Sequence, residues 1–183
     1  MTACEFREAD LGDAASIASL HAESWRSAYR GMLRDEFLDG DIFADRSALW
    51  ERRLRAPRAD QLVLLALDRG SLIGFACVFG AADPTWGAHL DNLHVRPATK
   101  GLGIGTQLVG RAVTWLQEGF PGNGLFLWVY EANTGARGLY DKLGGEVRER
   151  EISPAPGGGT IVRLRYVWPD LDALSRDITA SRS

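Results

Sequence analysis

The distribution of apolar and polar positions predicts strands and helices in alternation along most of the chain. Short apolar runs that end at turn residues are typical of strands. Seven segments have this character: 4–8, 61–67, 72–79, 89–95, 125–129, 146–153 and 160–168. Apolar residues spaced three and four positions apart predict helices instead. Helical segments are predicted over 10–31, 35–55 and 104–118.

The order of these segments favours a mixed α/β fold. The strands at 61–67 and 72–79 are joined by a short turn and therefore predict a hairpin. The strands at 146–153 and 160–168 predict a second hairpin near the other end of the chain. Strands and helices that alternate between two hairpins are typical of one mixed sheet flanked by helices.

Composition narrows the class of protein. The chain has 183 residues, 45% hydrophobic and 25% charged, as expected for one globular domain. Its formal net charge of −3 argues against a nucleic-acid partner. No apolar run approaches the roughly 18 residues of a membrane span, and the N-terminus lacks a signal-peptide core. We therefore expect no membrane partner. Because Cys4 and Cys77 have no paired spacing, we also expect a reducing, cytoplasmic setting.

The most informative segment joins the strand at 89–95 to the helix at 104–118. Three glycines, Gly101, Gly103 and Gly105, lie in this connection. A helix start leaves backbone N–H groups unpaired, and the positive end of the helix dipole adds to their attraction for an anion. Glycines also remove side chains that would hold a bulky anion away. The segment therefore predicts a phosphate or pyrophosphate site, although a merely flexible turn has a similar composition.

The spacing of the glycines indicates which ligand fits. A dinucleotide fingerprint needs glycine where Thr106 stands, and a Walker loop needs a lysine after Gly105. The pattern present is a basic residue followed by x-x-G-x-G, as Lys100, Gly103 and Gly105. This pattern resembles the acyl-CoA-binding loop of the GNAT superfamily of acetyltransferases. The family usually has Arg or Gln at the first position, and Lys100 brings positive charge without a fork of donors.

A second segment resembles the other half of the family's cofactor site. Four residues follow the strand at 125–129 with the expected spacing: Asn133, Ala136, Tyr140 and Gly144. Asn133 is suited to cap a helix, on which Ala136 and Tyr140 share a face at i and i+4. Gly144 suits the left-handed turn that ends such a helix. A half-buried packing residue is the plainer interpretation of Tyr140, but two motifs in the expected order are more specific than either alone.

The resemblance covers residues 3–168 as a single N-acetyltransferase domain and leaves 169–183 as a polar C-terminal tail that we expect to fray. It implies a mixed, mostly antiparallel sheet of six to seven strands flanked by about four helices. It also implies acetyl-CoA as co-substrate and a primary amine of a small molecule or peptide as acceptor. The residues implied to contact the cofactor are Leu93, His94, Val95, Lys100, Gly101, Leu102, Gly103, Ile104, Gly105, Thr106, Asn133, Ala136 and Tyr140.

Acetyl transfer to an amine by direct attack makes three chemical demands. The amine must lose a proton, because an alkyl ammonium ordinarily has a pKa of about 10.4. The thioester carbonyl needs a hydrogen-bond donor, and the departing thiolate benefits from a proton. The resemblance implies Tyr140 as the proton donor and a backbone N–H of residues 93–95 as the carbonyl donor. Positioning supplies much of the rate, so no covalent enzyme nucleophile is required.

His89 and Asp91 are the candidates for deprotonating the amine, because family members often place a base at matching positions. An ordinary histidine pKa of about 6.5 suits His89 to accept a proton near neutrality, and Asp91 could hold the imidazole or orient the ammonium. A surface histidine at the start of the strand is the plainer interpretation. Strict alternation places on one face His89, Asp91, Leu93 and Val95, and on the other Leu90, Asn92 and His94. Three histidines on two faces are not a usual zinc set, so no metal is expected.

The acceptor pocket is expected between the first helices and the loops beside the central strand. Four aromatic residues are candidates for its walls: Trp25, Tyr29, Trp86 and Trp128. Core packing is the commoner role of such residues. Two other functions fit the motifs, a non-catalytic acyl-CoA sensor and an acetyltransferase of protein N-termini or lysines. Exposed edge strands are also compatible with a homodimer. The acceptor and the acyl chain length are not identified by the sequence.

Overall fold

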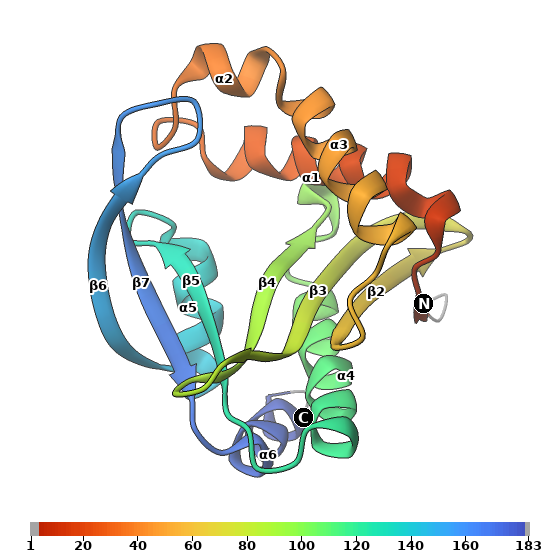
Figure 1. Ribbon diagram of the computed structural model, residues 1–183, viewed down its shortest axis with the longest axis vertical. Helices are drawn as coiled ribbons and strands as arrows, with labels where there is room; N and C mark the ends of the chain where they lie inside the picture. The colour runs from red at the N-terminus through yellow and green to blue at the C-terminus, as the bar shows by residue number, and fades with distance from the viewer. Residues whose placement is uncertain (1–3, 182–183) are drawn as a thin grey trace.

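The computed structural model describes residues 4–181 and consists of one seven-stranded sheet with helices on both faces (Figure 1). The strand order is β1-β2-β3-β4-β5-β7-β6. The strands are β1 (Glu5–Glu8), β2 (Gln61–Asp68), β3 (Ser71–Asp83), β4 (Gly87–Val95), β5 (Leu125–Tyr130), β6 (Glu146–Pro154) and β7 (Thr160–Trp168). The helices are α1 (Ala14–Ala28), α2 (Asp35–Asp39), α3 (Ile42–Arg55), α4 (Ile104–Gly119), α5 (Thr134–Lys142) and α6 (Leu171–Ala180). The predicted mixed, mostly antiparallel sheet is confirmed. Residue 3, the expected domain start, and residues 182–183 lie outside the described chain.

Within the described chain there are six α-helices, more than the four or so expected. One reason is that the helical segment predicted over 35–55 is divided at Gly40 into α2 and α3. The backbone N–H of Gly40 donates to the carbonyl oxygen of Glu36 at 3.1 Å. A Cβ atom at Gly40 would lie 2.6 Å from that oxygen, so this tight exit from α2 requires glycine. None of the helices between residues 4 and 181 has the length and apolar character needed to cross a bilayer.

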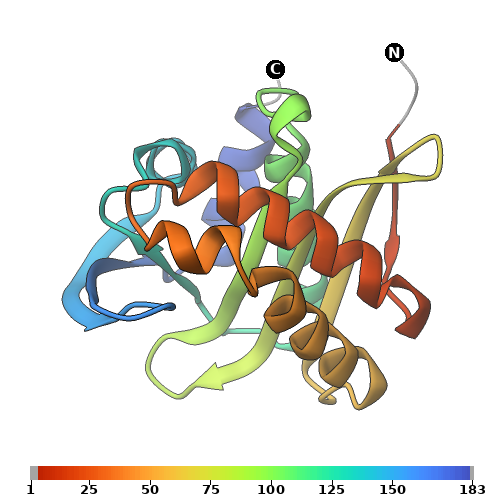
Figure 2. The same cartoon turned by 90° about the horizontal axis from the view of Figure 1, so that it is seen from above.

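Two helical layers cover opposite faces of the sheet (Figure 2). On one face, α1 and α3 bury Ile17 and Trp50 against Phe75 of β3. On the other face, α4 buries Leu108 and Leu116 in a larger core that also includes residues of β5, β7, α5 and α6. The central strands therefore carry apolar side chains on both faces, which explains why β2 and β3 appear in the sequence as nearly continuous apolar runs.

A β-bulge interrupts β4 at Asp91. Val78 of β3 pairs with Leu90, whereas the preceding residue, Cys77, pairs with Asn92. Asp91 is therefore the extra residue on β4, without an opposite residue on β3. Such an insertion moves all later side chains of the strand to the other face.

As a result, His89 and His94 lie on the same face of the sheet. They pair with Phe79 and Phe75, which both pack in the layer beneath α1 and α3. Leu93 packs instead in the core beneath α4. The expected grouping, with His89 beside Leu93 and opposite His94, is therefore wrong, because strict alternation does not allow for the bulge.

β4 and β5 form the single parallel strand pair of the sheet described between residues 4 and 181, and they separate soon after they meet. Their pairing consists of Ala88 with Leu125 and His89 with Phe126. From Leu90 onward, β4 has no strand partner on this side within the described chain, and the two ribbons diverge (Figure 1). The divergence leaves backbone N–H and C=O groups of β4 without strand partners.

Residues 171–180 form a helix rather than the frayed polar tail that the sequence led us to expect. α6 turns Leu171, Leu174 and Ile178 toward the core, where all three are buried. The carboxylate of Asp170 caps the helix by accepting hydrogen bonds from two backbone N–H groups at 2.8 and 3.1 Å. The segment is polar in composition, but its apolar residues are spaced so that a helix collects them on one face.

Replacing Leu174 by Ala should lower the free energy of unfolding by about 2–4 kcal/mol, because a side chain that is 1% exposed would leave a cavity. Arg176→Ala on the exposed face of α6 is the matched control, with an expected change within about 0.5 kcal/mol. Urea unfolding measures both variants. Equal stability of the two would show that α6 contributes little to the core.

Candidate functional site

A cleft of about 770 Å³ opens where β4 and β5 diverge. Its walls are formed by β4, β5, the loop before α4 with the start of that helix, α5 and the end of α1. Every residue predicted to contact the cofactor lines it: Leu93, His94, Val95, Lys100, Gly101, Leu102, Gly103, Ile104, Gly105, Thr106, Asn133, Ala136 and Tyr140. The fold therefore brings both sequence motifs to one cavity.

The glycine loop forms an open cradle at the start of α4. Gly101 and Gly103 have φ angles of 82° and 73°, in the left-handed region that side chains disfavour. A Cβ atom at either position would have no atom of the described chain within 4 Å. Among the described residues, no side chain caps the start of α4. The first backbone N–H groups of this helix are therefore available for an anion. Lys100, directly before the loop, adds positive charge at the same wall.

The second motif forms the helix that the sequence predicted. The side-chain oxygen of Asn133 accepts a hydrogen bond from the backbone N–H of Ala136 at 3.3 Å, which confirms the predicted cap. Gly144 has a φ of 72°, which confirms the predicted left-handed turn after the helix. The backbone N–H of Gly145 also donates to the carbonyl oxygen of Tyr140 at 2.9 Å. Both ends of α5 are thereby fixed, and with them the position of Tyr140 in the wall of the cleft.

Tyr140 combines a buried ring with a position in the cleft wall. The ring packs against Tyr166 and Trp168, with centroid distances of 5.6 and 6.0 Å. The residue is 7% exposed, and its hydroxyl makes no hydrogen bond to the described residues. Burial, and secondly the neighbouring Tyr166, raise the pKa of Tyr140. The hydroxyl therefore stays protonated near neutral pH and has a proton to donate.

The main chain of residues 93–95 forms the β4 side of the cleft. These residues pair with β3 through their other edge, which holds the strand in place. On the edge that faces β5, the described chain supplies no strand partner. Free backbone groups in a cleft are hydrogen-bonding partners for an extended ligand.

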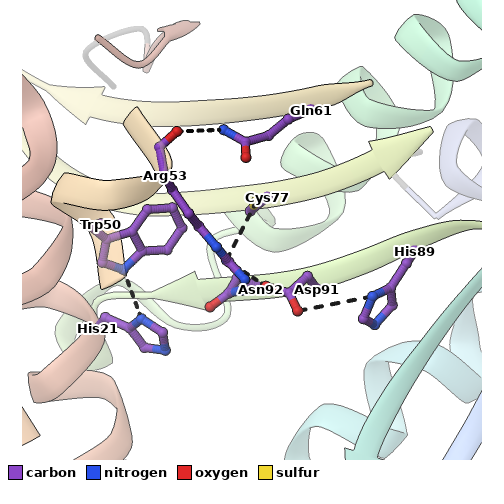
Figure 3. Close-up of polar contacts among 8 residues, drawn as sticks. All are labelled: His21, Trp50, Arg53, Gln61, Cys77, His89, Asp91 and Asn92. Atoms are coloured by element: carbon purple, nitrogen blue, oxygen red, sulfur yellow. Dashed lines mark hydrogen bonds and ion pairs between the residues drawn. The ribbon is translucent and has the colours of Figure 1, made fainter. Parts of the chain in front are cut away.

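Asp91 brings a carboxylate to the cleft, and neighbouring side chains fix its position. Arg53 of α3 donates from Nη1 to Oδ2 of Asp91 at 2.6 Å, and the Asn92 amide donates to the same oxygen. The other oxygen, Oδ1, lies 4.0 Å from Nδ1 of His89 (Figure 3). Asp91 lines the cleft with its side chain 24% exposed. One carboxylate oxygen is thus anchored to the protein, while the other remains for a ligand.

His89 precedes Asp91 on β4, at the point where β4 and β5 separate, and is not among the residues that line the cleft. Its ring stacks on Phe126 with a centroid distance of 4.6 Å and an interplanar angle of 7°. Burial lowers the pKa of His89, and the opposing effect of the Asp91 carboxylate is smaller. The imidazole is therefore neutral near pH 7, as a proton acceptor must be.

His94 lines the cleft, and its side chain contacts α1. Its Nδ1 lies 2.9 Å from the hydroxyl oxygen of Ser24, and its ring centroid is 4.5 Å from that of His21. Burial lowers the pKa of His94 to about 3, so the ring stays neutral. His21 accepts a hydrogen bond at Nδ1 from Nε1 of Trp50 at 3.0 Å, which places the imidazole proton on Nε2.

The four aromatic candidates for the acceptor pocket separate into two pairs. Tyr29 and Trp128 line the cleft. Trp25 packs instead against His21, with 5.2 Å between the ring centroids. The Cζ atom of Arg46 lies 4.5 Å from the centroid of the Trp25 ring. Trp86 lies at a separate, smaller pocket formed with residues such as Gly124 and Arg148. Packing against neighbouring side chains accounts for the position of Trp25, and Trp86 lies at the surface away from the cleft.

Three polar residues beside the predicted site were not identified from the sequence: Ser24, Arg53 and Asn92. Ser24 and Arg53 belong to helices that reach β4 through tertiary packing, and no local motif marks them. Strict alternation places Asn92 on the face opposite His89, because it does not allow for the bulge. The only sequence signal for it was its position next to Asp91.

Comparison with known sequences identifies relatives of this chain. The model of the acetyltransferase (GNAT) family matches residues 17–145. An uncharacterized N-acetyltransferase of Bacillus subtilis, YuaI, is 27% identical over 173 residues, covering 92% of this chain and 94% of that protein. A probable N-acetyltransferase of Mycobacterium tuberculosis, Rv2775, is 28% identical over 155 residues, covering 82% and 84%.

Solved structures share the fold. PaiA N-acetyltransferase of Thermoplasma acidophilum, in complex with coenzyme A, superposes with a TM-score of 0.74 at 21% identity, covering 89% of this chain and 98% of that one. NAA60 of Arabidopsis thaliana, in complex with a bisubstrate analogue, superposes with a TM-score of 0.68 at 18% identity, covering 91% and 98%. At these identities the likeness supports the fold alone.

Replacing Trp50 by Phe should lower the free energy of unfolding by about 1–3 kcal/mol, because it leaves the buried Nδ1 of His21 without a donor. Trp115→Phe is the matched control, since Trp115 packs against Phe120 without a hydrogen bond to the described residues. Thermal and urea unfolding measure the difference between the two variants. If both lose the same stability, the Trp50–His21 hydrogen bond contributes nothing beyond packing.

Proposed function

The chain belongs to the GNAT family of acetyltransferases, and we propose that it transfers an acetyl group from acetyl-CoA to a primary amine in a ternary complex. One observation carries this proposal: the anion cradle, the Tyr140 wall and the anchored Asp91 carboxylate share one cleft. The cradle suits the donor's pyrophosphate, the carboxylate suits a substrate ammonium, and Tyr140 lies in the wall of the same cavity. The acceptor is a small molecule or a peptide.

The donor half of the proposed site is built from backbone groups. The first N–H groups of α4 and the loop at Gly101 and Gly103 bind the pyrophosphate, assisted by the charge of Lys100. The free edge of residues 93–95 binds the pantetheine arm, and one of its N–H groups donates to the thioester carbonyl oxygen. These donors are held by the sheet and by α4, so they need little reorganisation as negative charge develops on that oxygen.

Tyr140 is the proposed general acid. As the amine nitrogen bonds to the acetyl carbon, the carbon–sulfur bond breaks and the Tyr140 hydroxyl transfers its proton to the departing sulfur. The new amide nitrogen then loses its second proton, which restores the Tyr140 hydroxyl. Its raised pKa keeps the proton in place until that step. Fixing α5 at both ends holds the hydroxyl in the wall of the cleft throughout the reaction.

The amine half of the proposed site begins at Asp91. Its Oδ1 attracts the substrate ammonium, while Arg53 and Asn92 hold Oδ2. Because His89 does not line the cleft, the ammonium then loses a proton to its neutral imidazole through a water beside Asp91, whose Oδ1 lies 4.0 Å from Nδ1 of His89. Tyr29 and Trp128 supply aromatic walls that suit a cation before it is deprotonated.

Replacing Gly103 by Val should weaken acetyl-CoA binding at least tenfold, because a side chain at a φ of 73° strains the loop and extends into open space at the cradle. Gly119→Val, at the other end of α4, is the matched control and should leave the affinity unchanged. Isothermal titration calorimetry with acetyl-CoA and CoA measures both variants. Unchanged affinity of the Gly103 variant would remove the loop from the cofactor site.

Replacing Tyr140 by Phe should lower kcat about 100-fold and leave acetyl-CoA affinity nearly unchanged, because it removes a proton donor and keeps the ring. The measurement is thiol release with a panel of amines, together with calorimetry. Tyr166→Phe is the control, because that hydroxyl donates to Asp141 at 2.7 Å and not to the reaction. A wild-type chain that binds acetyl-CoA without turnover on any amine would instead support a non-catalytic sensor.

A further inference from the structure

Arg53 connects α3 to the amine half of the cleft. Its Nη1 lies 2.6 Å from Oδ2 of Asp91 and 3.8 Å from Sγ of Cys77, on the face of the sheet that α1 and α3 cover (Figure 3). The guanidinium also lies 5.3 Å from the ring of Trp50 and 5.4 Å from that of Phe79. At 19% exposure, the Arg53 side chain has little freedom to leave this position.

Arg53 contacts Asp91, the residue of β4 that has no paired residue on either neighbouring strand of the described sheet. Asp91 is the extra residue of the bulge and has no opposite residue on β3. Its orientation therefore depends on side-chain contacts, and the described chain supplies two hydrogen bonds, from Arg53 and Asn92 to the same oxygen. The planar guanidinium of Arg53 packs near two aromatic rings and loses little conformational freedom when it bonds to Asp91. Arg53 therefore holds the carboxylate more firmly than the Asn92 amide alone would.

We propose that Arg53 is a positioning residue for the acetyl transfer: it holds Oδ2 of Asp91 so that Oδ1 meets both the acceptor amine and His89. This proposal rests on the proposed function for its catalytic consequence, but not for its geometry. Arg53 itself touches neither substrate nor reacting atoms. Its second effect is electrostatic, because it balances the charge of Asp91 beside His89.

The charges that face His89 come from three elements. Asp91 on β4 is the one carboxylate among them and favours the protonated imidazole, whereas Arg53 on α3 and Arg163 and Arg165 on β7 disfavour it. Removing Arg53 deletes one cation and leaves the Asp91 carboxylate without its ion pair. Both changes raise the pKa of His89, so the imidazole remains protonated to a higher pH. Because a base must be neutral, the acidic limb of the pH profile of kcat/KM should move to higher pH.

The test combines NMR titration with steady-state kinetics on the full chain. The chain has three histidines, and burial lowers the pKa of the other two, His21 and His94. The imidazole signal of His89 is assigned by its loss in His89→Gln. Arg53→Gln should raise the pKa of His89, move the acidic limb in the same direction and lower kcat/KM at pH 7 by about 10- to 100-fold.

Three further variants separate positioning from general destabilisation. Arg55→Gln removes a cation from the exposed end of the same helix and should leave the titration and the kinetics unchanged. Arg53→Lys keeps the charge and should recover much of the His89 titration but less of kcat/KM, since lysine lacks the planar fork. Asp91→Asn should move the pKa of His89 the opposite way, to a lower value.

Each outcome decides one of the two proposals. If Arg53→Gln leaves the His89 titration unchanged, Arg53 is not a positioning residue. If the titration moves as expected but the acidic limb does not follow it, the positioning geometry stands and His89 is not the base. If no amine is acetylated by the wild-type chain, the proposed function fails while the NMR titration still decides the role of Arg53.

Discussion

The separation of β4 from β5 is the constraint on which the rest of the structure depends. In a mostly antiparallel sheet, these two parallel strands share two residue pairs, at Ala88 and His89, and then diverge. β4 is held to β3 and covered on both faces, while β5 is paired with β7 along its length. Each strand is therefore stable without the other. The gap can stay open and present backbone groups to a ligand at no cost to the core.

The cleft has two ends with different chemistry, and each is built by a different structural device. At one end, left-handed glycines and an uncapped helix start expose N–H groups, which suits an anion. At the other end, a bulge turns a carboxylate out of the β4 ladder, which suits a cation. The proposed reaction uses both ends, with the phosphorylated acyl donor at the first and the charged amine at the second.

Burial sets the protonation states that the proposed reaction requires. It raises the pKa of Tyr140, which keeps a proton on the acid, and lowers the pKa of His89, which keeps the base neutral. The same solvent exclusion acts on both groups in opposite directions, because one is charged when deprotonated and the other when protonated. Arg53 adjusts the balance by offsetting the nearby Asp91 carboxylate.

The seven strands, the glycine cradle and the α5 motif that includes Tyr140 could be predicted from the sequence. These features depend on periodicity, capping and positive φ, which are local properties of the chain. Tertiary structure decided the face of His94, the contact of Arg53 with Asp91 and the packing of residues 171–180. A bulge, an ion pair between distant elements and the docking of a polar helix arise from how strands and helices meet, and no short segment of sequence encodes them.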